Sequence, residues 1–216
     1  MSDKRKPERD PDGLSIDPDF LDEINQTILI YVAMDFDSES GELKFFPAVD
    51  WSFASGGMAP DGDVIAKIKE LGGMPLGDVK TAYDIDLRDL AADGKVAKKV
   101  ELIYHLAYPN WTFGDDIISM KKEFPQSNEG GTFRGLHTRA LGSFERDRTA
   151  YLYNRNHEKD SQDSPVSTLY QLDLHINIKQ KLGNQWCKAT GDDDCMRMTP
   201  VIIDPGVGND GSGGDP

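Results

Sequence analysis

An aromatic segment with a neighbouring amide is the first part of the chain that could do chemistry. Trp111 lies between Asn110 and Phe113 in the run Tyr-Pro-Asn-Trp-Thr-Phe. A Trp ring can stack on a sugar or a base, and an amide beside it can orient a hydroxyl. We therefore expect a site for a neutral sugar or another small molecule at this turn. Its members would be Asn110, Trp111 and Phe113, with Trp51 or Trp186 as a second wall. The alternative is that these rings close an open end of the hydrophobic core.

Acidic loops offer a second kind of chemistry, because calcium prefers carboxylate and carbonyl oxygens. Residues 35–41 place oxygen-bearing side chains at the first, third and fifth positions of an EF-hand-like loop. The loop then departs from that motif, because Gly41 stands at the seventh position and Phe46 at the twelfth. Residues 192–194 are three further aspartates. We expect no cofactor, with calcium-assisted glycan binding as the alternative to solvated acidic loops.

Three histidines on separate segments could meet around a metal ion. A metal-assisted hydrolase would use His105, His137 or His175 with Asp115 or Asp116. Their spacing matches no zinc motif, and the chain has no phosphate-binding glycine loop and no G-x-S-x-G nucleophile turn. We therefore expect a protein that is not an enzyme, and keep the hydrolase as an alternative.

Charge and composition narrow the range of partners. The 216 residues carry 24 Lys and Arg against 38 Asp and Glu, a difference of −14. Such a chain repels phosphate backbones and anionic lipid, so we expect neither nucleic acid nor membrane as a partner. No long apolar span and no apolar leader is visible, which favours a cytoplasmic location. The two cysteines, Cys187 and Cys195, flank a turn and are expected to be free thiols in a reducing compartment.

Hydrophobic residues alternate with a period of two, which predicts strands. Residues 170–178 and 100–108 alternate most regularly, whereas residues 28–34 are apolar on both faces and would need cover on both sides. Further strands are expected at 43–49, 83–87, 149–154 and 199–204. The expected core consists of alternating residues from the longest strands: Ile28, Ile30, Val32, Leu102, Tyr104, Leu106, Leu172, Leu174 and Ile176.

One helix is expected, from about Asp63 to Leu71, with Asp61 or Asp63 as its cap and glycines at its end. Roughly seven to nine short strands with one helix are typical of an antiparallel β-sandwich. Residues 24–205 would form this all-β domain. Residues 1–23 are charged and Pro-rich, and residues 206–216 are rich in Gly and Asp, so both are expected to be flexible tails that form no strand.

Three segments near the ends of this domain resemble a known family. They are Ile-Leu-Ile-Tyr-Val-Ala-Met-Asp at 28–35, Tyr-Gln-Leu-Asp-Leu-His-Ile-Asn-Ile at 170–178 and Val-Ile-Ile-Asp-Pro at 201–205. They are similar to the AidA/PixA family of bacterial inclusion-body proteins. The resemblance implies a small cytoplasmic β-sandwich whose last strand ends in Asp-Pro, and it carries over no site residues.

These observations predict a protein that works by self-assembly or by binding a ligand. Strand 28–34 is apolar on both faces, so its second face must be covered by another layer, by the helix or by a partner subunit. We therefore expect a homo-oligomer. A lectin-like module is the alternative binding function.

Overall fold

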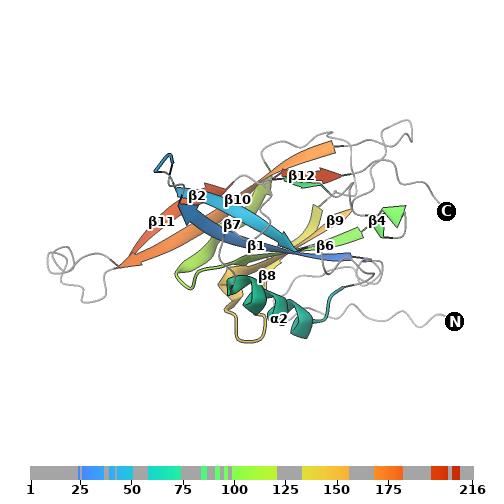
Figure 1. Ribbon diagram of the computed structural model, residues 1–216, viewed down its shortest axis with the longest axis horizontal. Coiled ribbons are helices and arrows are strands. Elements are labelled where there is room, and N and C mark those ends of the chain that lie inside the picture. Colours follow the sequence, from blue (N-terminus) through green and yellow to red (C-terminus); the bar gives the residue numbers. More distant parts are fainter. Residues whose placement is uncertain are drawn as a thin grey trace.

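The computed structural model describes residues 24, 26–36, 39–41, 43–50, 58–73, 84–86, 91–92, 95–96, 99–120, 133–155, 168–181, 196–203 and 206–209. Within these residues the chain forms two packed β-sheets and one α-helix (Figure 1). The predicted all-β sandwich with one short helix is confirmed. No helix of this part of the chain is long and apolar enough to cross a membrane.

The first sheet, called sheet 1 below, has the strand order β2-β1-β6-β9-β8. Its strands are β1 (Gln26–Phe36), β2 (Leu43–Asp50), β6 (Lys99–Leu106), β8 (Phe133–Thr138) and β9 (Thr149–Arg155). The central pair β1–β6 is parallel, whereas the other pairs of this sheet are antiparallel. A parallel pair needs a long crossover connection, and the chain between β1 and β6 supplies one that contains the helix.

The second sheet, sheet 2, is built around one long strand, β10 (Thr168–Lys181). β7 (Trp111–Met120) pairs with one edge of β10, and β11 (Met196–Ile203) pairs with the other. β12 (Gly206–Asn209) pairs with the start of β10 and lies parallel to β3 (Asp84–Asp86). A separate two-residue pair joins β4 (Ala91–Ala92) to β5 (Lys95–Val96).

Strand β12 contradicts the expectation that the C-terminal residues form no strand. Residues 206–209 pair with both β10 and β3, so the expectation that residues from 206 onward form no strand is wrong for these four. Backbone pairing needs no bulky side chain, and a Gly-rich segment can therefore join a sheet between two existing strands. Residues 210–216 and the expected tail 1–23 lie outside the described residues.

The sandwich core lies between the inner faces of the two sheets. All nine residues expected in the core are buried there, none more than 3% exposed, which confirms that part of the sequence pattern. Burying each such side chain stabilises the fold by about 1.5–3 kcal/mol. The alternation therefore fixes which face of each strand points inward.

A second apolar cluster lies between sheet 1 and the helix α2 (Asp61–Gly72), which covers the outer face of that sheet (Figure 1). Leu29, Tyr31 and Ala33 of β1 face Val64, Ile68 and Leu71 of α2. This explains why β1 is apolar on both faces. The helix covers the second apolar face of β1, so that face is no longer evidence for a partner subunit. The turn that follows β8 also packs on α2, since Gly142 has φ +58° and a Cβ there would lie 2.5 Å from Cδ1 of Ile65.

Candidate functional site

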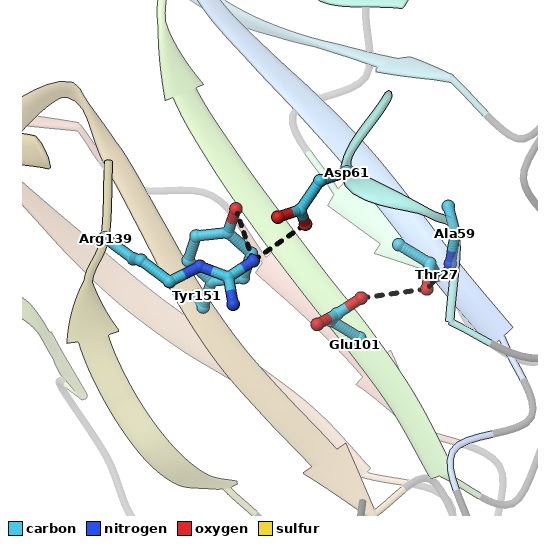
Figure 2. A network of polar contacts seen from close by, with 6 residues as sticks. All are labelled: Thr27, Ala59, Asp61, Glu101, Arg139 and Tyr151. Carbon is cyan, nitrogen blue, oxygen red and sulfur yellow. Dashed lines mark hydrogen bonds and ion pairs between the residues drawn. The ribbon is translucent and has the colours of Figure 1, made fainter. Parts of the chain in front are cut away.

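Polar side chains gather at the start of α2, in a group called the helix-side cluster: Thr27, Asp61, Glu101, Arg139 and Tyr151 (Figure 2). They come from β1, α2, β6, the residue after β8, and β9. No side chain caps the helix, because Pro60 occupies the cap position. The expected capping residue Asp61 instead accepts a hydrogen bond from Nη2 of Arg139 at 2.8 Å.

The helix-side cluster fastens the beginning of α2 to sheet 1 at two points. At one, the Thr27 hydroxyl accepts the Ala59 backbone N–H at 2.9 Å and donates to Oε2 of Glu101 at 2.9 Å (Figure 2). At the other, Arg139 holds Asp61 and also donates to the Tyr151 hydroxyl at 3.4 Å. The Arg139 guanidinium lies 4.7 Å from the Tyr151 ring centre, a cation–π distance. Both points tie chain segments that are distant in the sequence.

Glu101 is the most unusual group of this cluster, because it is a carboxyl that is only 5% exposed. Burial raises its pKa, while the Thr27 hydrogen bond and the positive charge of Arg139 oppose that rise. The protonated form is therefore favoured more than in an exposed Glu. Perturbed carboxyls occur at functional sites and also in structural networks, and Thr27, which donates to Glu101 at 2.9 Å, belongs to the helix attachment.

Two of the three histidines singled out in the sequence lie on the same outer face of sheet 1. His105 is 1% exposed, and its Nδ1 lies 2.9 Å from Oγ1 of Thr149. Burial, helped by the positive charge of Arg148, lowers the pKa of His105 to about 3, so its ring stays neutral at physiological pH. His137 is 4% exposed and stacks on Tyr151 with ring centres 5.3 Å apart. Neither ring is open to a ligand.

The third histidine, His175, lies on the other side of the molecule, on the outer face of sheet 2. Its Nε2 lies 2.7 Å from Oγ of Ser119, which stands on the neighbouring strand β7. Both side chains are half-buried and reach solvent. The three histidines therefore do not converge, and no group of three or more metal-ligating side chains is found among the described residues. The alternative in which the three histidines meet around zinc is therefore not supported by the described residues.

Strand β7 bulges beside His175. Its register with β10 jumps from Ile118 opposite Leu174 to Phe113 opposite Ile176, so residues 114–117 have no single partner on β10. Such bulges re-aim side chains and are common next to active sites. Asp115 and Asp116, the acidic pair singled out in the sequence, are exposed within this bulge. The two aspartates therefore lie at the level of His175, and not at the level of His105 or His137.

The expected ligand turn has a structural role instead. Trp111 is 1% exposed, and its ring packs against Tyr108 at 4.7 Å and Phe45 at 5.6 Å between ring centres. Phe113 is 7% exposed in the same core. The exposed Asn110 uses its amide to donate to the carbonyl of Lys179 at 3.1 Å. Trp111 therefore has no free ring face, and the expectation that it stacks a sugar fails because the ring completes the core.

Trp51, Trp186, both cysteines and the acidic run 192–194 lie outside the described residues, and the loop 35–41 is described only in part. Sequence reasoning missed Ser119 and Glu101. Glu101 alternates with the core residues of segment 100–108, which showed that it points away from the sandwich core, but its partner strand β1 was not visible in the pattern. Ser119 lies on β7, a strand that was not expected from the sequence. No family model matches the chain, and the curated proteins and solved structures give no match either.

Proposed function

We propose that the protein acts by self-association, with the outer face of sheet 2 as the contact between two copies. One observation carries this proposal. Met198 is 45% exposed and Ile202 is 57% exposed, and both lie on the outer side of β11 with the exposed Pro200 between them. Among the described residues they are two of the three large hydrophobic side chains that are exposed. Apolar groups concentrated on one strand are typical of a contact surface.

The contact is between faces rather than between strand edges. Among the described strands, β11 ends sheet 2 on this side, and an edge strand can pair with another chain. Pro200 in its middle has no N–H to donate, which interrupts such pairing. The apolar ridge of Met198, Pro200 and Ile202 therefore contributes through its side chains.

Charges on the same face fit a second copy. Lys179 lies beside Met198 at one end of the face, and Asp115 and Asp116 lie at the level of Ile202 at the other. A twofold axis that crosses β11 at Pro200, in the plane of contact and perpendicular to the strand, would place Met198 against Ile202 of the second copy. The same axis would bring the lysine of each copy towards the aspartates of the other, which favours this arrangement over a parallel one.

Sedimentation velocity at micromolar concentration tests the proposal. The wild type is expected to be a dimer, and the double variant M198K/I202K a monomer with an unchanged melting temperature, since both residues are exposed. Met58, which is 47% exposed but lies next to α2, offers a matched control, and M58K should remain a dimer. A wild-type monomer, or loss of the dimer in M58K alone, would contradict the proposal.

A charge swap tests the orientation of the two copies. K179E should weaken the dimer, and adding D115K and D116K should restore it. Restoration is the result that a simple loss of fold cannot produce.

Membership of the AidA/PixA family also stays a proposal; it is supported by the three similar segments and agrees with an assembling β-sandwich.

A further inference from the structure

We infer that Ser119 is an activated nucleophile for carboxylic esters, with His175 as its general base. The pair meets the first geometric requirement of such a site, because 2.7 Å separates Oγ of Ser119 from Nε2 of His175. In the tautomer with its proton on Nδ1, the imidazole accepts the hydroxyl proton at Nε2. The pair lies on the same outer face of sheet 2 as the proposed dimer contact, but it rests on a different observation, so the two proposals are tested separately.

The surroundings of the pair also fit this chemistry. Asp173 lies on the same face and stands directly opposite Ser119 in the strand register. It is 9% exposed, so it places a largely buried carboxyl group on the same face as the pair. The bulge of β7 lies at the level of His175, and such bulges are common next to active sites.

The neighbouring strand indicates the class of substrate. Ile202 is the register partner of His175 across β10 and β11, and directly opposed side chains lie on the same face of a sheet. Because Ile202 is 57% exposed, it offers an apolar surface beside the reactive pair. The exposed Asp115 and Asp116 repel anions. An uncharged ester with a short apolar acyl group therefore fits better than a phosphate ester.

The reaction is a two-step acyl transfer. Oγ of Ser119 bonds to the ester carbonyl carbon, its proton passes to Nε2 of His175, and the bond to the alcohol oxygen breaks as that oxygen takes the proton. Water then attacks the acyl-serine, giving its proton to Nε2 and its hydroxyl to the acyl carbon, and Ser119 regains a proton as the acid leaves. No metal or redox partner enters this balance.

A fluorophosphonate probe tests the nucleophile directly, because it replaces its P–F bond with a bond to a reactive serine oxygen and releases fluoride and a proton. Intact mass and peptide mapping of the full chain should show one adduct, on Ser119. S119A should show none, and H175N should label at least about a hundredfold more slowly, the usual contribution of a general base. S143A, which changes an exposed serine in a turn, is the matched control and should label like the wild type.

Two further measurements keep the test decisive. The single variant M198K places a charge in the proposed dimer contact and leaves Ile202 unchanged. Labelling of M198K, with its oligomeric state measured by sedimentation, shows whether a dimer shields Ser119. Hydrolysis of p-nitrophenyl butyrate should exceed that of the acetate in the wild type, and I202S should remove this preference. No adduct in either the wild type or M198K, or equal labelling in H175N, would overturn the inference. A monomeric wild type that still labels at Ser119 would overturn only the dimer.

Discussion

Each outer face of the sandwich carries a histidine that is hydrogen-bonded to a hydroxyl group. The two faces differ in what covers this pair. On sheet 1, His105 and Thr149 are 2.9 Å apart and fully buried. On sheet 2, His175 and Ser119 are 2.7 Å apart and half-buried. In the first pair burial keeps the imidazole neutral and shuts out any substrate. The same pair of groups is therefore structural on one face and available for chemistry on the other, and solvent access makes the difference.

The largest expected difference in the free energy of unfolding is between substitutions on the inner and outer sides of β7. W111A removes a buried ring from the core and should lower the free energy of unfolding by about 3–5 kcal/mol. S119A on the outer side of the same strand loses one hydrogen bond, worth about 0.5–1.5 kcal/mol. Urea unfolding measures both. A loss of less than about 0.5 kcal/mol in W111A, as for a surface residue, would show that Trp111 does not complete the core.

The two histidines should respond differently to the same substitution. H105Q leaves Thr149 buried with a poorer partner and should cost about 1–3 kcal/mol at pH 7.5, whereas H175Q should cost less than about 1 kcal/mol. The folded pKa of His105, about 3, lies below its ordinary value of 6.5, so the unfolded chain takes up a proton first as the pH falls.

The stability that His105 contributes is therefore complete above pH 6.5 and is lost between pH 6.5 and 3. As the pH falls through that range, the difference in stability between wild type and H105Q should shrink and then change sign, because it changes by as much as about 1.4 kcal/mol for each pH unit. Urea unfolding at several pH values measures this. A difference that stays constant with pH would contradict the neutral buried state of His105.

Glu101 should show the opposite pH dependence, although it lies on the same strand as His105. Its pKa is raised by burial, so the folded protein holds the proton more tightly than the unfolded chain. Stability is lost as the pH rises above the ordinary value of 4.5. E101Q keeps an oxygen that can accept the Thr27 hydroxyl and carries no charge, and its stability relative to the wild type should rise with pH over that window. A flat difference would mean that Glu101 is ionised without cost.

The exposed part of the helix-side cluster should give the smallest effect. The Arg139–Asp61 pair is open to solvent, with side chains 39% and 63% exposed, and such pairs contribute about 0.2–1 kcal/mol. A double-mutant cycle with R139M and D61N measures the coupling, and salt should reduce it. A coupling well above this range would show that the ion pair, and not the apolar cluster beneath it, holds α2 on sheet 1.

The sequence by itself determined the faces of the strands. Alternation placed Leu102, Leu172 and the rest of the core correctly, because a period of two assigns each residue to one side of a sheet whatever its partner. The single helix and the need to cover both sides of β1 were likewise visible, since they depend on residues close in sequence.

The tertiary structure decided which strands are neighbours and which faces are covered. Backbone hydrogen bonds are the same for any pair of strands, so nothing local reveals that β6 lies parallel to β1, that residues 206–209 join β10, or that Ser119 meets His175. His105 and His175 occupy equivalent polar positions in two similar alternating strands. The packing of α2 and of the turn at 141–144 on sheet 1, contacts between distant segments, buries the surroundings of His105 and leaves those of His175 open.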